Sequence, residues 1–214
     1  MSVWPDPTET DELLNSAKQG DAGAVNQLLD RHRRGLRRML ELRLDPALAR
    51  RVDASDIVQD VLIVANRRLA EYLARPAMPF QLWLRQLARD RLIDAHRRHR
   101  VAQRRSLDRE QPLTAGALGD RSSLDLATQL RDPELTPAAA AMRDELDRRF
   151  RVALETLDQQ DREVVLMRHD EQFSNQEVAE ALGLSAAAAG MRYLRAMRRL
   201  RTRLDRTSTA GDGP

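Results

Sequence analysis

Three arginines near the C-terminus have the side-chain chemistry and the spacing that binding to DNA requires. Arg192, Arg195 and Arg199 recur at steps of three and four residues, so they project from neighbouring positions of one helix. A guanidinium group can donate two parallel hydrogen bonds to a phosphate or to the edge of a guanine. The alternative is an ordinary helical hairpin with a solvated arginine face, and the preceding residues distinguish the two interpretations.

The segment before these arginines carries the local signals of a helix-turn-helix. Ser174 and Glu177 form a capping-box pattern, which predicts the start of a helix. Gly183 suits the left-handed position that ends this helix, and Ser185 can cap the next one. The last helix has an apolar stripe of Ala189, Tyr193, Ala196, Met197, Leu200 and Leu204. Because the caps, the turn and the basic face fall in register, the sequence predicts a helix that enters the major groove of DNA.

A second set of polar side chains lies on a helix predicted over about residues 53–73. Asp56, Gln59 and Asp60 occupy positions i, i+3 and i+4, so one face of this helix is polar and acidic. Taken alone, the pattern fits a solvated surface. The functional interpretation is a docking face for a basic partner.

The helix predicted from Phe80 to about Arg100 combines aromatic and basic residues. Trp83 falls on its apolar stripe, so we expect this side chain in the core. Basic side chains beside an aromatic ring can also bind unstacked, single-stranded bases. The basic residues on the other faces of the helix are Arg85, Arg89, Arg91, His96 and Arg98.

Two histidines on the same helix raise the question of catalysis. His96 and His99 lie close to Asp94, a spacing that metal binding or acid–base chemistry could use. In so arginine-rich a helix, solvated or phosphate-facing histidines are the simpler interpretation. The sequence also has no P-loop, no dinucleotide-binding glycine pattern and no HExxH motif. We therefore expect no catalysis, no cofactor and no metal, and an enzyme is only the second alternative.

The composition narrows the class of protein further. The chain has no cysteine, which removes disulfides and thiolate chemistry and suits a reducing cytoplasm. The N-terminus lacks the pattern of a signal peptide, and the apolar runs are far shorter than the roughly 20 residues of a membrane helix. Charged residues make up 32% of the chain but the net charge is only +3. Because the arginines are clustered, we expect a cytoplasmic protein with localised polyanion contacts and no membrane insertion.

Helical periodicity without strand alternation predicts an all-α fold of two small helical domains joined by a flexible linker. We expect Thr10 to cap the first helix and residues 162–169 to form one helix before the capping box. A short helix near residues 123–130 fits the linker. The predicted parts are an N-terminal domain at 10–106, the linker at 107–137, the helix-turn-helix domain at 138–206 and a disordered tail at 207–214.

Several segments resemble, in their order along the chain, the extracytoplasmic-function (ECF) class of bacterial RNA polymerase sigma factors. Each segment alone is moderately specific, whereas their common order is strongly so. The resemblance covers nearly the whole chain. The segments are residues 17–21, 53–60, 80–94, 154–163 and 177–185.

The resemblance implies that the protein binds core RNA polymerase, directs it to promoter DNA and assists in opening that DNA. The face formed by Asp56, Gln59 and Asp60 matches the family's contact with a coiled coil in the polymerase's largest subunit. The helix-turn-helix, with Ser185 and the three arginines, matches the part that reads the −35 element. The part that binds and melts the −10 element matches Arg75, Phe80, Arg85, Arg89, Arg91 and Arg98. We expect a monomer when free, and an anti-sigma factor is a common partner in the family.

Two departures and one alternative accompany this resemblance. Residues 186–190 read Ala-Ala-Ala-Ala-Gly where the family has more polar variety, so the strength of the −35 readout stays open. The usual proline-containing stretch is replaced by Asp158-Gln-Gln-Asp161. A stand-alone helix-turn-helix regulator of transcription is the alternative function. It explains the C-terminal half but not the acidic face and the arginine-rich helix of the N-terminal half.

Overall fold

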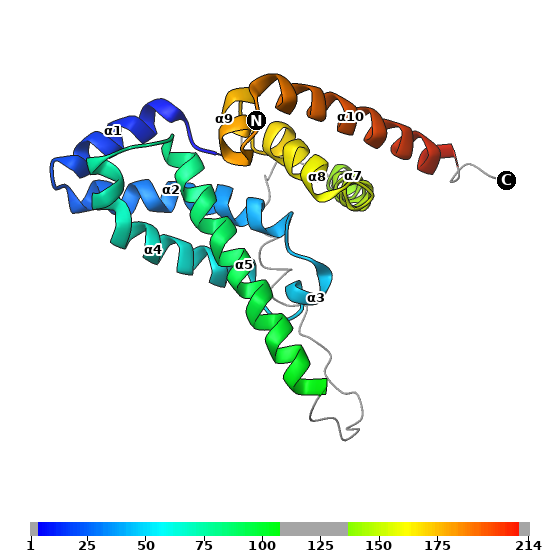
Figure 1. The fold of residues 1–214 in the computed structure, drawn as a ribbon, viewed down its shortest axis with the longest axis horizontal. Coiled ribbons are helices and arrows are strands. Elements are labelled where there is room, and N and C mark those ends of the chain that lie inside the picture. The colour runs from blue at the N-terminus through cyan, green and yellow to red at the C-terminus, as the bar shows by residue number, and fades with distance from the viewer. Residues whose placement is uncertain (1–3, 108–136, 210–214) are drawn as a thin grey trace.

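A computed structural model describes residues 4–107 and 137–209, and every regular element within those ranges is a helix (Figure 1). The helical fold class predicted from the periodicity is therefore confirmed. The predicted linker and the short helix near residues 123–130 lie outside the described residues, apart from the ends of the linker at residues 107 and 137.

The N-terminal half is a bundle in which α1, α2, α4 and α5 pack against one another. Its apolar interior contains Leu28 and Leu36 of α2, Val61 of α4 and Leu84 of α5, all fully buried. The helices are α1 (Pro7–Lys18), α2 (Ala22–Glu41), α3 (Pro46–Ala49), α4 (Ala54–Ala74) and α5 (Phe80–Leu107).

Short-range caps set where these helices begin. Asp21 and Asp53 accept hydrogen bonds from the first free backbone N–H groups of α2 and α4, which relieves unpaired donors at each end. The first helix begins earlier than the sequence suggested, because Asp6 and not Thr10 is its cap. Thr10 is buried inside the helix and donates its hydroxyl to the Asp6 carbonyl at 2.9 Å. The prediction that Thr10 caps this helix was wrong.

The C-terminal half consists of α7 (Pro137–Glu155), α8 (Gln159–Val165), η1 (Leu166–Asp170), α9 (Asn175–Leu182) and α10 (Ala186–Thr209). The single helix predicted over residues 162–169 is instead α8, capped by Asp158, followed by the π-helical turn η1. Within η1 the Glu171 N–H donates to the Leu166 carbonyl at 3.0 Å, one residue further back than in an α-helix. Residues 207–209, predicted as part of the disordered tail, continue α10.

The two halves share one apolar core. Val164, Met167, Phe173 and Val178 of the C-terminal half belong to the same cluster of buried side chains as α2, α4 and α5. Trp4 lies at this junction, with its ring centroid 6.2 Å from that of Phe173. Figure 1 shows the N-terminus beside α9, in agreement with this contact. The sequence analysis did not foresee that the two halves pack together.

His32 of α2 is a buried titratable group near this junction. It is fully buried, its Nδ1 lies 2.7 Å from the Leu28 carbonyl oxygen, and its ring packs edge-on against Phe80. Its Nε2 is also buried and has no hydrogen-bond partner among the described residues. Burial lowers the pKa of His32 below its ordinary value of 6.5, because an imidazolium there would lose its hydration.

We expect the free energy of unfolding to fall as the pH decreases below 6.5, the ordinary histidine pKa. In that range the unfolded chain binds a proton that folded His32 does not, so protonation favours unfolding. Thermal melting between about pH 8 and pH 5 measures the effect. The variant His32→Leu should lose most of this pH dependence, whereas His169→Gln, at an exposed position, should keep it. Identical pH profiles for His32→Leu and the wild type would contradict the assignment.

Candidate functional site

The polar face of α4 predicted from the sequence is exposed. The buried residues Ile57, Val58 and Val61 fix the orientation of the helix, and Asp56, Gln59 and Asp60 consequently face solvent. Because Asp53 caps the helix, the acidic residues begin in its first turn, where the helix dipole favours negative charge. The geometry therefore provides the docking face that the spacing predicted, although its occupant stays a prediction.

An exposed isoleucine extends this face. Ile63 is 43% exposed and follows Asp60 by three residues, so it lies one turn along the same side of α4. Sequence reasoning missed it, although its place at i+3 and i+4 from two predicted contact residues was a usable signal. An apolar side chain between acidic ones is typical of a surface that is covered by a protein partner.

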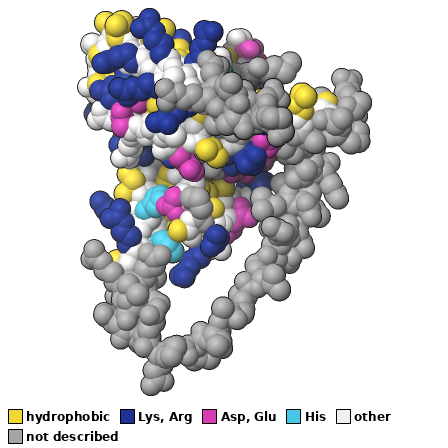
Figure 2. Space-filling view, turned by 90° about the vertical axis from the view of Figure 1, so that its right-hand side faces the viewer, with side chains coloured by type: hydrophobic (Ala, Val, Ile, Leu, Met, Phe, Trp, Pro, Cys, Tyr) yellow, Lys and Arg dark blue, Asp and Glu magenta, His cyan; other side chains and the backbone are white. Residues whose placement is uncertain are grey.

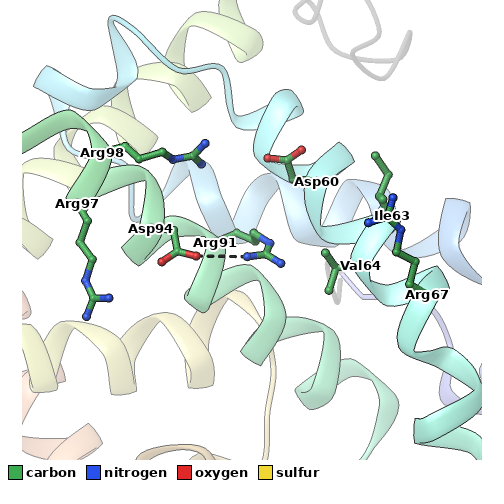
Figure 3. A pocket seen from close by; sticks show the side chains of 8 residues that line it. All are labelled: Asp60, Ile63, Val64, Arg67, Arg91, Asp94, Arg97 and Arg98. Carbon is green, nitrogen blue, oxygen red and sulfur yellow. Dashed lines mark hydrogen bonds and ion pairs between the residues drawn. The ribbon is translucent and has the colours of Figure 1, made fainter. Parts of the chain in front are cut away.

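A groove of about 620 Å³ joins this face of α4 to the basic side of α5 (Figure 3). Within the groove Arg91 and Asp94 point toward one another, and Arg91 Nη1 lies 3.3 Å from Asp94 Oδ2. Residues of the predicted polymerase face and of the predicted −10 surface thus line one depression. Its lining residues are Asp60, Ile63, Val64, Arg67, Arg91, Asp94, Arg97 and Arg98.

The side chains predicted to bind the −10 element divide into exposed and buried members. Arg75, Arg89 and Arg98 are exposed, and Arg91 is half-buried in the groove. Phe80 and Arg85, in contrast, are buried. Neither of these two side chains can touch DNA in this conformation.

Phe80 belongs to an aromatic cluster that fixes the start of α5. Its ring packs against His32, Tyr72 and Trp83, with centroids 5.1 to 5.5 Å away. Tyr72 stacks on Trp83 and donates its hydroxyl to the Met78 carbonyl at 3.0 Å. This bond ties the loop after Arg75 to the end of α4. The expectation that Trp83 is a core residue is confirmed, and Phe80 has the same structural role here.

Arg85 belongs to a buried cluster of charges that the sequence analysis did not detect. Arg43 and Arg85 of the N-terminal half bind Glu163 and Glu171 of the C-terminal half. Burial by itself would raise the pKa of Glu163, but the charges of Arg43 and Arg85 outweigh it and hold that pKa below the ordinary value. All four groups are therefore charged at neutral pH, and each depends on the others for compensation.

The helix-turn-helix has the local geometry that its sequence predicted. The Glu177 N–H donates to Ser174 Oγ at 3.2 Å, and the Ser174 N–H donates to Glu177 Oε2 at 2.7 Å. Gly183 has a φ of 65°, in the left-handed region that favours glycine. Ser185 accepts a hydrogen bond from the Ala188 N–H at 3.1 Å, so it caps α10. These predictions are confirmed.

Gly190 determines how closely α9 and α10 approach each other. A Cβ atom at this position would lie 3.1 Å from Asn175 Nδ2, a tighter contact than most side chains make. The glycine that seemed to weaken the recognition helix therefore has a packing reason.

The three arginines of α10 do not share one environment. Arg199 Nη1 lies 2.8 Å from Asp161 Oδ2, and Arg192 donates to Gln160 at 2.6 Å and lies 3.6 Å from Asp161. Both therefore lean back against α8. Arg195 is exposed, on the side of α10 that faces away from the core. Figure 2 shows basic side chains gathered over the upper part of one face, where Figure 1 places α7, α8 and α10.

The histidines considered for metal binding have other surroundings. His96 Nδ1 lies 3.3 Å from Asp45 Oδ2, near the start of α3, so its carboxylate neighbour is not Asp94. No group of three or more metal-ligating side chains occurs in the part of the chain that the structure describes. None of the described helices is long and apolar enough to cross a lipid bilayer.

Comparison with known proteins identifies the family. Residues 25–101 match the family described as Sigma-70 region 2, and residues 147–200 match Sigma-70, region 4. The RNA polymerase sigma factor CnrH of Cupriavidus metallidurans is 31% identical over 204 residues, which are 94% of this chain and 98% of that protein. The solved structure of CnrH in complex with the cytosolic domain of CnrY has the same fold, with a TM-score of 0.56 and 24% identity over 94% of this chain and 98% of that one.

A further relative is similar over part of its own length. The probable RNA polymerase sigma factor RfaY of Xanthomonas campestris pv. campestris is 35% identical over 159 residues, 74% of this chain but only 36% of that protein. The chain belongs to the RNA polymerase sigma factors and, within them, to the ECF class. A stand-alone helix-turn-helix regulator is not favoured, because region 2 matches the N-terminal half as well.

Proposed function

We propose that this sigma factor binds core RNA polymerase through the α4 face of Asp56, Gln59 and Asp60. The observation that carries the proposal is the exposure of this acidic face on one half of the chain and of Arg195 on the other. Two exposed surfaces of opposite charge suit two different partners, a basic protein surface and a polyanion. Ile63 adds apolar contact area beside the acidic residues.

The −10 element, in this proposal, lies along the exposed arginines of α5. Arg89, Arg91 and Arg98 would contact the phosphates, and Arg75 would flank the loop before the helix. Opening duplex DNA costs about 1.4 kcal/mol per base-pair step in lost stacking. Since the sequence has no nucleotide-hydrolysing motif, binding of displaced bases must supply this free energy. Phe80 would contribute indirectly, by fixing the start of α5.

The −35 element would lie against α10, with Ser185, Arg192, Arg195 and Arg199 as contacts. Arg195 can reach a phosphate or a guanine from its exposed position. Arg192 and Arg199 would first exchange their bonds with α8 for bonds with DNA, so they contribute less per residue. The alanines at the start of α10 allow close approach of the backbone but little hydrogen bonding to bases.

Arg195→Ala is expected to weaken binding to a −35 duplex and to reduce the salt dependence of that binding by about one phosphate contact. The reason is the loss of one exposed cation from the DNA-facing side of α10. Fluorescence anisotropy with labelled promoter duplex, at several salt concentrations, measures both quantities. The matched control is Arg148→Ala, which removes an arginine that pairs with Glu145 on α7. If the salt slopes of Arg195→Ala and the wild type coincide, Arg195 makes no phosphate contact.

We further propose that the protein catalyses no reaction itself, acts in the cytoplasm and is regulated by an anti-sigma factor. The first two points follow from its class of transcription initiation factors and from the lack of a catalytic motif. The third is supported by the solved complex of CnrH with the cytosolic domain of CnrY. The CnrY domain is a partner of CnrH, and its counterpart for this chain has to be found by co-purification.

Run-off transcription with purified core polymerase on genomic DNA tests the proposed function directly. Specific transcripts should appear only when this protein is added. A protein that binds operator DNA but leaves core polymerase unable to start at any specific site would instead be a stand-alone regulator.

A further inference from the structure

The buried charges between the two halves of the chain divide by sign. The N-terminal half contributes the cations Arg43 and Arg85, and the C-terminal half contributes the anions Glu163 and Glu171. Arg43 Nη2 donates to Glu171 Oε1 at 2.5 Å, and Arg85 Nε donates to Glu171 Oε2 at 3.1 Å. Arg43 Nε also donates to Glu163 Oε2 at 3.0 Å. The side chain of Glu171 is only 1% exposed, so the two arginines replace its hydration.

Polar contacts around this cluster join the same two halves. Arg38 Nε donates to Asp170 Oδ1 at 3.3 Å, and Arg162 Nη2 donates to the Leu42 carbonyl at 2.7 Å. Gln172, which follows the cluster residue Glu171, has a φ of 62°, a conformation that residues other than glycine rarely adopt. The loop after η1 is thus held in an unusual backbone conformation beside its contacts with the N-terminal half.

A cluster of this kind makes an interface that can separate. Burying four charges costs desolvation free energy, which their mutual attraction offsets only when every partner is present. When the halves part, each charge regains water, so the loss of the ion pairs is largely compensated. Removing a single partner leaves an uncompensated buried charge and therefore favours the separated state.

From this geometry we propose that the C-terminal half docks on the N-terminal half in the polymerase-free protein through Arg43, Arg85, Glu163 and Glu171, and that undocking releases Arg85 for the −10 element. The second part rests on the proposed function. In the docked state Arg85 is 2% exposed and donates to both glutamates. Docking and promoter binding therefore compete for the same guanidinium group.

Distance measurements between the halves test the docking. The sequence has no cysteine, so Ala70→Cys on α4 and Glu180→Cys on α9, both at exposed positions, accept spin labels without background. In the polymerase-free protein, pulsed electron paramagnetic resonance should give one narrow, short distance distribution. Adding Glu171→Gln should move most of the population to longer, broader distances. The control Glu145→Gln changes a carboxylate that pairs only with arginines of α7 among the described residues, and should leave the distribution unchanged.

The possible outcomes separate docking from function. A Glu171→Gln protein that keeps the wild-type distance distribution overturns the docking proposal. If that variant fails to fold, the labelled wild type with and without core polymerase decides, because binding should lengthen the distance. Polymerase binding at an unchanged distance overturns the proposed undocking. Failure of the wild type to bind polymerase at all contradicts the proposed function, while the polymerase-free comparison still decides the docking.

Discussion

Alanine at both Asp56 and Gln59 is expected to weaken binding of the protein to core RNA polymerase by roughly tenfold or more, which is about 1.4 kcal/mol. Both side chains are exposed on α4, so the substitutions remove polar groups from the proposed interface without opening the core. Asp56 lies in the first turn of α4, where loss of its charge costs only about 0.3–1 kcal/mol of stability. Surface plasmon resonance with immobilised core polymerase measures the affinity, and thermal melting measures the stability.

The matched control replaces Glu12 and Gln27 with alanine. These residues are also exposed, but they lie on α1 and α2, away from the α4 face. Their loss should leave the affinity for core polymerase within about twofold of the wild type, as surface substitutions outside an interface usually do. Equal affinity losses for the two double variants would indicate a general effect of net charge. An unchanged affinity for the α4 variant would remove the assignment of this face.

Features that depend on neighbouring residues could be predicted from the sequence. The capping box of Ser174 and Glu177, the left-handed Gly183 and the caps Asp21 and Asp53 each depend on a few consecutive residues. Such interactions depend on little besides the local chain. Even here the prediction of Thr10 as a cap was wrong, because Asp6, followed by Pro7 at the first helical position, supplies an equally good start earlier in the chain.

Features that depend on distant residues could not be predicted in this way. Arg43 and Arg85 meet Glu163 and Glu171 only because the two halves pack together, and on a sequence all four resemble solvated surface charges. The same packing buries Arg85, which its position on an arginine-rich helix had suggested for DNA. The turn η1 has no local signal either, although it carries Asp170 to Arg38. A charged residue on a helix therefore cannot be placed without knowing what covers that helix.

Trp4 is the residue outside both matched family regions whose loss should affect the fold most. Its side chain is 4% exposed, and its ring packs against His32 and Phe173, at centroid distances of 6.1 and 6.2 Å. The carbonyl of Pro5, the next residue, accepts a hydrogen bond from Gln81 at 3.1 Å, which fixes the segment on α5. Trp4→Ala is expected to lower the free energy of unfolding by about 3–5 kcal/mol, the usual cost of truncating a buried aromatic side chain.

Gly35 provides a sharper test of the same contact through the sign of a second substitution. A Cβ atom on Gly35 would lie 2.8 Å from Trp4 Cε3, so Gly35→Ala must displace the ring and should destabilise the wild type by roughly 1–3 kcal/mol. In the Trp4→Ala background this obstacle is absent, and alanine in mid-helix should instead stabilise by up to about 1 kcal/mol. Urea unfolding of all four proteins in the double-mutant cycle measures the difference. The same sign in both backgrounds would mean that Trp4 does not pack on Gly35, and that the glycine in α2 has another cause.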